Sequence, residues 1–372
     1  MRRIYIYQLT QWPHFQWNTG EIASVLAGVR HQQGRLLGRM ENLGFTLREE
    51  ATLQTLTLDV LKSSEIEGEL LDAQQVRSSV ARRLGMDIAG LVPADRNVEG
   101  VVEMMLDATQ QYQELLTEDR LFGWQASLFP AGRSGMHRIV TGQWRDNLPD
   151  DPMQVVSGPM ERETVHFQAP DADQVPAEMK AFLDWFNAPD KTDPVLRAAI
   201  AHLWFVTIHP FDDGNGRIAR AITDMQLARA DETRQRFYSM STQIRAERKA
   251  YYDILEATQK GRMDITPWIH WFLGCLERSI EAAGATLAGV MKKATFWKQP
   301  ATHTLNDRQK LMLNKLLDGF TGKLTSSKWA KIAKTSQDTA IRDIQDLINR
   351  QLLVKEPAGG RSTSYLLNDA LF

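Results

Sequence analysis

One twelve-residue segment constrains this chain more than any other. Residues 209–220 read His-Pro-Phe-Asp-Asp-Gly-Asn-Gly-Arg-Ile-Ala-Arg and follow the apolar run Ala198–Ile208. Within and beyond the segment, Ile218, Ile222 and Met225 recur at the spacing of one face of an amphipathic helix. The segment is therefore predicted to form the loop, and the start of the second helix, of a helix-loop-helix.

The residue types of this segment suit a chain of phosphates. Gly214 and Gly216 allow positive φ and a close backbone approach, so the amides that open the second helix can point at an anion. Arg217 and Arg220 lie about one turn apart on one face of that helix, and arginine holds phosphate oxygens in bidentate fashion. A polyphosphate can span both arginines.

Two further residues of the segment can carry chemistry. Asp213 supplies a hard oxygen ligand for magnesium, which proteins usually share between a carboxylate and phosphates. His209, with an unperturbed pKa of about 6.5, can be neutral at pH 7 and remove the proton of an attacking hydroxyl group. The segment thus predicts a phosphate-handling site with a base and a metal ligand.

The segment allows two other interpretations, a structural turn and a dinucleotide-binding loop. A histidine before proline is usually a turn residue, but here it stands in a dense polar constellation. Residues 214–219 also fit the Gly-x-Gly-x-x-Ala fingerprint of dinucleotide binding. No alternation of strands and helices surrounds them, and Pro210 interrupts the passage from a strand to the turn, so that interpretation fails on context.

The segment resembles the signature of Fic-domain proteins, His-Pro-Phe-x-Asp/Glu-Gly-Asn-Gly-Arg-x-x-Arg, at every defined position. This resemblance implies transfer of AMP from ATP to a hydroxyl side chain of a protein, within a helical core and with Mg²⁺ as cofactor. His209 then looks like the general base and Asp213 like the magnesium ligand. The resemblance assigns the phosphates to the rest of the site: the Gly214 and Gly216 backbone, Asn215, Arg217, and Arg220, which would reach the γ-phosphate.

A second segment resembles the inhibitory pattern of the same family, Ser/Thr-x-x-x-Glu-Gly/Asn. Residues 63–68 read Ser-Ser-Glu-Ile-Glu-Gly, so the defined positions are Ser63, Glu67 and Gly68. In the family this glutamate pairs with the second arginine of the signature, here Arg220, and denies that guanidinium to the γ-phosphate. Glu67 is therefore predicted to border the ATP site and to inhibit it, and it could also position water to remove AMP. Without the signature, the same residues would suggest a solvated helix face that Gly68 closes.

Two elements near the signature complete the expected site. Residues 153–167 contain two β-prone runs separated by Ser-Gly-Pro and a polar stretch, which predict a β-hairpin. It resembles the flap along which Fic proteins register the backbone of their target. Tyr251 and Tyr252 diverge by about 100° on a helix, so one can pack inward while the other lines a pocket. By resemblance the pair contacts the adenine, and Gln259 stands where the family has asparagine.

The composition sets the class of protein. With 372 residues, 43% hydrophobic and 24% charged, the chain can bury a large core, and we expect a mainly α protein of several domains. They are an N-terminal helical domain (1–100) with the inhibitory motif, a Fic-type core (101–295) and a C-terminal domain (301–372). The single cysteine, Cys275, excludes an internal disulfide. Because no 18-residue apolar stretch occurs, we expect a soluble, cytoplasmic protein without membrane contact.

Residues 301–372 differ in charge from the rest of the chain. They contain eleven Lys or Arg and seven Asp or Glu, a local net charge of +4 against −2 overall. Three periodic segments and two short β-prone runs resemble a winged helix, with a recognition helix beginning near Ser336 and Arg361 at the tip of the wing. That helix carries acidic residues that would repel phosphates if they faced a DNA groove: Asp338, Asp343 and Asp346. On this ground a protein-interaction role is favoured over DNA binding.

The sequence therefore predicts a self-inhibited protein adenylyltransferase that uses ATP and Mg²⁺ to modify a Ser, Thr or Tyr hydroxyl of a protein, itself included. A homodimer is a further expectation, because Fic proteins often regulate the inhibitory contact through dimer contacts. The alternative is a regulator that senses nucleotide in this site and acts on DNA or protein through its C-terminal domain. Turnover discriminates between the two.

Overall fold

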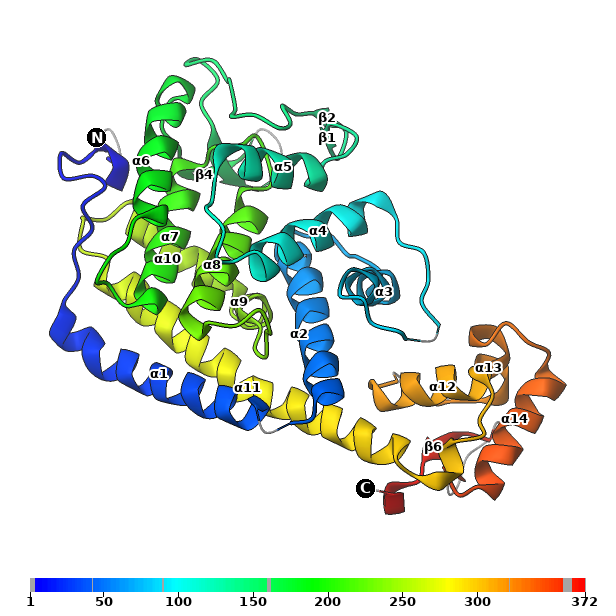
Figure 1. The fold of residues 1–372 in the computed structure, drawn as a ribbon. Helices are drawn as coiled ribbons and strands as arrows, with labels where there is room; N and C mark the ends of the chain where they lie inside the picture. The colour runs from blue at the N-terminus through cyan, green and yellow to red at the C-terminus, as the bar shows by residue number, and fades with distance from the viewer. Residues whose placement is uncertain are drawn as a thin grey trace.

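The computed structural model describes residues 4–41, 43–88, 90–158, 162–320, 322–356 and 363–371. Across this part of the chain helices dominate, and the β-structure consists of three two-stranded antiparallel sheets (Figure 1). The predicted mainly α fold is confirmed. Within the same ranges, no helix has both the length and the apolar character that a membrane span requires.

The N-terminal part is built from three helices, the second of which reaches the candidate site. They are α1 (Thr19–Glu41), α2 (Phe45–Ile66) and α3 (Ala73–Arg83). Helix α1 packs along α11 (Thr266–Trp297), and the two long helices run side by side in Figure 1. Helix α2 contacts α8 (Asn215–Asp231) and is capped by Glu67, after which Gly68 takes a φ of +88° that glycine adopts most readily.

The central part is a group of helices around α7 (Pro194–Ile208). Every residue of α7 after its first is buried, as expected for a helix that is apolar on nearly all sides. The helix begins with Pro194 at its first position and with Asp193, which accepts a hydrogen bond from the backbone N–H of Val195. Further helices of this part are α4 (Arg96–Gln110), α5 (Glu118–Leu128), α6 (Val175–Asn187), α9 (Met240–Ala246) and α10 (Arg248–Gln259).

Two hairpins lie between α5 and α6 in the chain. Strand β1 (Arg133–Ser134) pairs with β2 (His137–Arg138), and β3 (Gln154–Ser157) pairs with β4 (Thr164–Gln168). The predicted hairpin over 153–167 is thus present, although residues 159–161 of its turn lie outside the described residues. Short 3₁₀ helices also occur at four places in the described residues: η1 (Ile6–Gln8), η2 (Ala172–Gln174), η3 (Pro300–Thr302) and η4 (Asp369–Leu371).

The C-terminal part has a hydrophobic cluster of its own, which begins with Phe296 near the end of α11. Figure 1 places this part at the far end of that helix. Its elements follow the order expected from the sequence: α12 (Asp307–Leu317), α13 (Ser326–Ile332), α14 (Gln337–Asn349), β5 (Leu353–Lys355) and β6 (Tyr365–Leu367). Arg361, expected at the tip of the wing, lies outside the described residues.

Two of the three acidic residues of α14 are paired with residues of this same part. Asp343 is buried and accepts hydrogen bonds from the guanidinium of Arg308 at 2.8 and 3.0 Å. Asp346 accepts from Gln309 at 2.8 Å and pairs with Arg350 at 2.9 Å. The reason for disfavouring DNA therefore no longer holds for the buried Asp343, whereas Asp338 is exposed and the paired Asp346 is 43% exposed.

Candidate active site

The predicted helix-loop-helix is confirmed, with a loop whose shape is set at both ends. Helix α7 ends where His209 takes the left-handed conformation, with φ of 52°, and its backbone N–H donates to the carbonyl of Phe205 at 3.0 Å. Gly214 precedes α8 with φ of 90°. A Cβ atom at Gly214 would lie 3.1 Å from both Leu128 Cδ1 and Phe129 Cε2. Both the backbone angle and the lack of space therefore call for glycine at this position.

Asn215 holds the loop closed from inside. Its amide nitrogen donates to the carbonyl of Phe211 at 2.7 Å, and its amide oxygen accepts from the N–H of Phe211 at 3.0 Å. The side chain is buried. Its predicted contact with phosphate stays a prediction, and in this structure the side chain is bonded to the loop backbone.

Arg145, which the sequence reasoning missed, fixes the turn at His209. Its Nε donates to the carbonyl of His209 at 2.8 Å, and its Nη2 donates to the carbonyl of Pro170 at 2.5 Å. Burial lowers the pKa of this arginine to about 10, so it stays charged at neutral pH. Its partners are carbonyls far away in the sequence, and no spacing pattern marks such a contact.

His209 presents one nitrogen as a base. Its Nδ1 lies 3.3 Å from the carbonyl of Val206, and because a carbonyl can only accept, Nδ1 carries the hydrogen in the neutral ring. The lone pair then resides on Nε2. Burial lowers the pKa of His209 to about 4, against the opposing effect of the Val206 contact. The ring is therefore neutral at pH 7, as a proton acceptor must be.

Asp213 is the one acidic side chain of the loop that suits a metal shared with phosphates. One carboxylate oxygen accepts from the N–H of Gly214 at 2.6 Å, and the other accepts from the hydroxyl of Ser134 in β1. Among the described residues, no group of three or more His, Cys, Asp or Glu could hold a metal. A single carboxylate fits Mg²⁺, which proteins commonly bind through one or two carboxylates, phosphates and water.

Arg220 is held by the last turns of α2. It is buried; its Nε donates to the hydroxyl of Ser63 at 2.9 Å and its Nη2 to the carbonyl of Ser63 at 2.8 Å. The same Nη2 lies 2.8 Å from Oε1 of Glu67. Within the described part of the chain, its Nη1 has no hydrogen-bond acceptor. The structure therefore brings together the three residues that the sequence predicted for the inhibitory contact.

The carboxylate of Glu67 lies against the N-terminal end of α8. A Cβ atom built on Gly216 would be 2.2 Å from Oε1 of Glu67, so the absence of a side chain at Gly216 makes room for the carboxylate. The first turn of a helix attracts anions through its N–H groups and its dipole. Glu67 thus occupies the position at which an anionic ligand of this helix would bind.

Arg217 forms an ion pair with a second carboxylate, that of Glu69, which the sequence did not predict. Its Nη1 lies 2.5 Å from Oε2 of Glu69, and its guanidinium lies over the ring of Phe129, 5.0 Å from the centroid. The side chain of Arg217 is 4% exposed and that of Glu69 is 50% exposed. Among the described residues, Nε of Arg217 finds no acceptor. The two signature arginines are therefore each paired with a carboxylate from the same short stretch after α2.

The tyrosine pair diverges as predicted, but Gln259 does not lie free at a pocket. Tyr251 is buried and its hydroxyl contacts Nε2 of His202 at 2.8 Å, whereas Tyr252 is partly exposed and lies under the guanidinium of Arg248. Gln259 donates to Val206 at 3.4 Å and to Thr207 at 3.3 Å. Its amide nitrogen therefore supports the last turn of α7, which argues against the predicted adenine contact through that atom.

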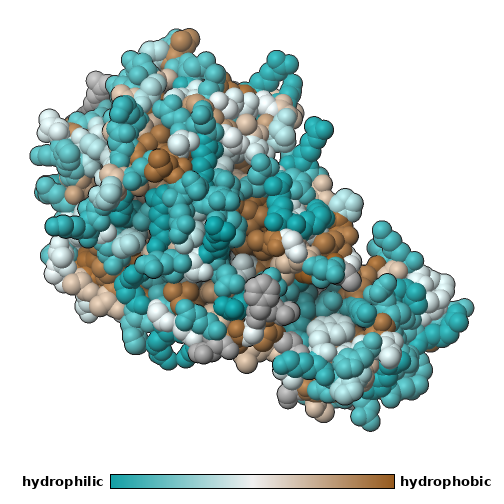
Figure 2. Space-filling view, in the orientation of Figure 1, coloured by the Kyte–Doolittle hydropathy of each residue, from teal (hydrophilic) through white to brown (hydrophobic). Residues whose placement is uncertain are grey.

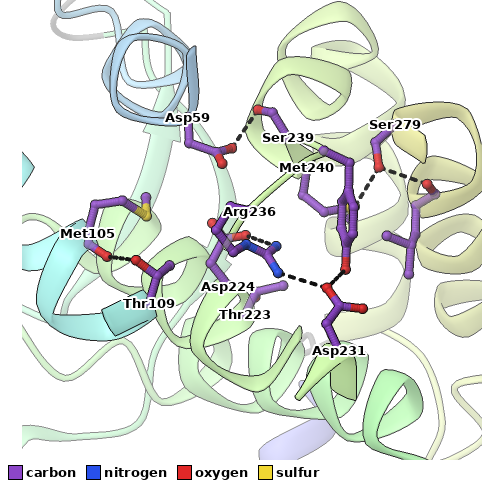
Figure 3. A network of polar contacts seen from close by, with 12 residues as sticks. Asp59, Met105, Thr109, Thr223, Asp224, Asp231, Arg236, Ser239, Met240 and Ser279 are labelled. Atoms are coloured by element: carbon purple, nitrogen blue, oxygen red, sulfur yellow. Dashed lines mark hydrogen bonds and ion pairs between the residues drawn. The ribbon is translucent and has the colours of Figure 1, made fainter. Parts of the chain in front are cut away.

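A second polar layer lies one helical turn deeper between α2 and α8 (Figure 3). Arg236 contacts Asp224 at 3.0 Å and Asp231 at 3.1 Å. Asp59 of α2 accepts from Ser239, and burial together with the charge of Asp224 raises the pKa of Asp59 well above its usual value. Through Asp59 this layer joins α2 to Ser239 at the start of α9, and through Arg236 it joins the segment before α9 to α8.

The β3–β4 hairpin contacts α10 through one histidine. His166 in β4 contacts the hydroxyl of Ser157 at 2.6 Å with Nε2 and the carboxylate of Glu256 at 2.6 Å with Nδ1. Glu256 lies one turn after Tyr252 on α10. The hairpin is thus placed beside the helix that carries the tyrosine pair.

Comparison with known proteins matches two segments of the chain. Residues 115–227 match the model of the Fic/DOC family, a range that includes the whole loop and both arginines. The chain carries a Fic domain. Residues 5–86 match a domain of unknown function (DUF4172), so Glu67 and Glu69 lie outside the Fic domain and belong to the segment before it.

Relatives that share the Fic domain are named protein adenylyltransferase Fic. The relative from Culex quinquefasciatus is 36% identical over 105 residues, which is 28% of this chain and 19% of the relative. That from Nematostella vectensis is 36% identical over 115 residues, 30% of this chain and 25% of the relative. That from Drosophila mojavensis is 25% identical over 228 residues, 60% of this chain and 40% of the relative. The chain thus matches less than half of the length of each.

Two solved structures share the fold around the Fic domain. A Fic family protein from Desulfovibrio desulfuricans G20 has a TM-score of 0.51 at 22% identity, over 93% of this chain and 96% of that chain. A Fic domain containing signaling protein from Bacteroides thetaiotaomicron VPI-5482 has a TM-score of 0.50 at 20% identity, over 70% and 97%. At these identities the likeness concerns the fold, and it agrees with the predicted Fic-type helical core.

Proposed function

We propose that this chain is an adenylyltransferase that moves AMP from ATP to a protein hydroxyl and that Glu67 inhibits it. One observation carries the proposal: two buried guanidiniums stand at the N-terminal end of α8, each with an N–H that has no acceptor among the described residues. Such donors are suited to phosphate oxygens. The names of the relatives with the same domain, protein adenylyltransferase, support AMP as the transferred group.

His209, Asp213 and the two arginines of α8 then each have a role in the transfer. Nε2 of His209 takes the proton of a Ser, Thr or Tyr hydroxyl, whose oxygen forms the new bond to the α-phosphorus. The bond between that phosphorus and the bridging oxygen to the β-phosphate breaks, and pyrophosphate leaves. Asp213 would hold Mg²⁺, which supplies charge neutralisation on the phosphates when it is bound. Arg217 and Arg220 bind the remaining phosphate oxygens.

The inhibited state is the one in which carboxylates hold both arginines. Glu67 at 2.8 Å from Arg220 competes with the γ-phosphate, and Glu69 at 2.5 Å from Arg217 competes with a neighbouring phosphate. Both carboxylates are partly exposed, so each can return to water when ATP displaces it. Glu67 is also placed where it could orient a water molecule for the reverse removal of AMP, as we propose for a second activity.

The acceptor and the assembly follow from the neighbouring elements. We propose that a target segment adds to the β3–β4 hairpin, since that hairpin is fastened to α10 through His166 and Glu256. Tyr252 on α10 is then the side chain placed to meet the adenine, and the buried Tyr251 supports it. A second copy of the chain is proposed as a partner that influences the contact between Glu67 and Arg220.

The test uses the intact mass of the full chain after incubation with Mg²⁺ and ATP. The Glu67→Gly variant is expected to gain the mass of AMP, on itself or on a lysate protein, and the Glu67→Gly/His209→Ala variant is expected to gain none. Glu65→Gly is the matched control in the same turn, because Glu65 pairs with Lys62 and Arg245 instead. If Glu67→Gly stays unlabelled, AMP transfer is refuted and nucleotide sensing becomes the better function. Equal labelling with and without His209 would refute the general base.

A further inference from the structure

The C-terminal part presents a cationic face that the catalytic proposal does not use. Helix α13 and helix α14 are joined by the four residues 333–336, and the two helices pack against each other. This is the spacing of a helix-turn-helix. Lys334 in the turn takes a φ of 48°, and the hydroxyl of Ser336 accepts the N–H of Thr339 to begin α14. The turn thus fixes how α14 projects from the domain.

Four cations line this face and only one acid accompanies them. The cations Lys328, Lys331, Lys334 and Arg342 are all exposed. None of the four forms an ion pair with another described residue. Of the acids that neighbour them along α14, Asp343 is buried and pairs with Arg308, and Asp346, whose side chain is 43% exposed, pairs with Arg350. With Asp338 as the exposed acid, the face has a net charge of +3.

The exposed stripe of α14 suits a DNA groove better than a protein surface. Gln337, Ile341, Arg342 and Gln345 lie on it together with the acidic Asp338, while Ala340, Ile344 and Leu347 are buried in the domain. Ile341, 46% exposed, is the large apolar side chain that α14 shows to solvent within the described residues. Protein interfaces gather aromatic and apolar side chains at their centre. Figure 2 shows this lobe as mostly hydrophilic.

We propose that this face binds duplex DNA, with α14 in the major groove. Arg342 and the two glutamines have the side chains that read guanine and adenine edges, and Ile341 can contact a thymine methyl group. Lys328, Lys331 and Lys334 lie on α13 and the turn, from which they reach the phosphates beside the groove. The preference for a protein partner, which rested on three acidic residues, is thereby reversed.

The test measures the binding of the full chain to a fluorescent random-sequence duplex of about 25 base pairs at several salt concentrations. Three phosphate contacts, from the three lysines, predict that log K falls with log salt with a slope of about −3. The Lys328→Glu/Lys331→Glu variant should lose affinity on the order of 10- to 100-fold near 0.1 M salt and flatten the slope by about 2. Lys180→Glu, an exposed lysine on α6, is the matched control and should bind as the wild type does.

Two results would overturn the proposal. One is the absence of salt-sensitive binding near 0.05 M salt, even if this face captures an acidic protein instead. The other is equal DNA binding by the wild type and the double variant. The fold of the double variant should be intact because both lysines are exposed, and a thermal melt checks this. DNA binding does not depend on AMP transfer, so either function can fail without the other.

Discussion

Helix α8 forms ion pairs at its N-terminal end and in its second half, the outer and the inner end, and water reaches only the outer one. At the outer end, Glu67 pairs with Arg220 and its side chain is 31% exposed. At the inner end, Arg236 pairs with Asp224, and their side chains are 0% and 1% exposed. Asp59 and Glu67 belong to the same face of α2, two turns apart, so one helix takes part in both ends.

The difference in exposure gives the two ends different uses. A carboxylate that leaves its arginine at the outer end regains water, so the exchange with a phosphate costs little. A carboxylate or guanidinium left alone at the inner end would be a buried, uncompensated charge. The inner end therefore holds the segment before α9 on α8, and the outer end is the ion pair that can change partners.

The largest effect is expected from loss of the inner guanidinium. Arg236→Met would leave Asp224 and Asp231 buried without their cation, which should lower the free energy of unfolding by about 3–5 kcal/mol. Denaturation by urea measures it. Lys249→Met, at a lysine whose side chain is 89% exposed, is the control and should change little. A loss below about 1 kcal/mol in Arg236→Met would mean that the inner end does not hold the segment before α9 on α8.

The outer end should respond in activity rather than in stability. Glu67→Gly is expected to speed AMP incorporation by about 5- to 150-fold, the range of a coupling of about 1–3 kcal/mol. Its free energy of unfolding should change by about 1 kcal/mol or less, because the pair is partly solvated. A time course of intact mass and a urea denaturation give the two numbers. A large loss of stability without a gain in rate would place Glu67 with the structural residues.

The inner end should also make stability depend on pH through Asp59. Burial, and next the charge of Asp224, raise the pKa of Asp59 in the folded chain, so the folded state binds the proton more tightly than the unfolded state. Stability from this group is present below about pH 4 and is lost as pH rises through the folded pKa, by at most about 1.4 kcal/mol per pH unit. Asp59→Asn should make this slope smaller, as urea denaturation between about pH 4 and 8 would reveal, while Asp224 and Asp231, whose pKa values burial also raises, keep their own contributions. Parallel slopes in the two proteins would contradict the assignment.

The smallest effect is expected at Glu69. Its side chain is 50% exposed, so its pair with Arg217 should be worth about 0.2–1 kcal/mol. Glu69→Gln should therefore tighten ATP binding by about 1.4- to 5-fold, measured by calorimetry, and should add to the effect of Glu67→Gly. Unchanged affinity in both backgrounds would exclude Glu69 from the inhibitory contact.

The sequence predicted the parts of the site that are written locally. The glycines, arginines and acid between His209 and Arg220 fall within one loop and one helical turn, where spacing alone determines which side chains share a face. The resemblance to a family pattern also pointed to Glu67 as the partner of Arg220, and the structure places the two in contact, with Ser63 of the same motif as a further partner. The overall helical character followed from periodic apolar residues.

The sequence could not show which polar side chains form hydrogen bonds within the protein and so are not free to bind a ligand. Asn215 and Gln259 were assigned to ATP, yet both amides satisfy main-chain or hydroxyl groups of the α7–α8 region. Arg145 and Glu69 were missed because their partners are distant in the sequence and depend on the path of the chain after a turn, such as Gly68. The spacing of residues predicts which side chains share a face of a helix, whereas tertiary packing determines which residues that face contacts.

The most direct test of the exchangeable outer end compares ATP with AMP in equilibrium binding to the wild type and to Glu67→Gly, in the presence of Mg²⁺. If Glu67 competes with the γ-phosphate for Arg220, the variant should bind ATP on the order of 10-fold more tightly and AMP within about 2-fold of the wild type, since AMP has no phosphate to reach that arginine. Equal changes for both nucleotides, or no change for either, would contradict the account.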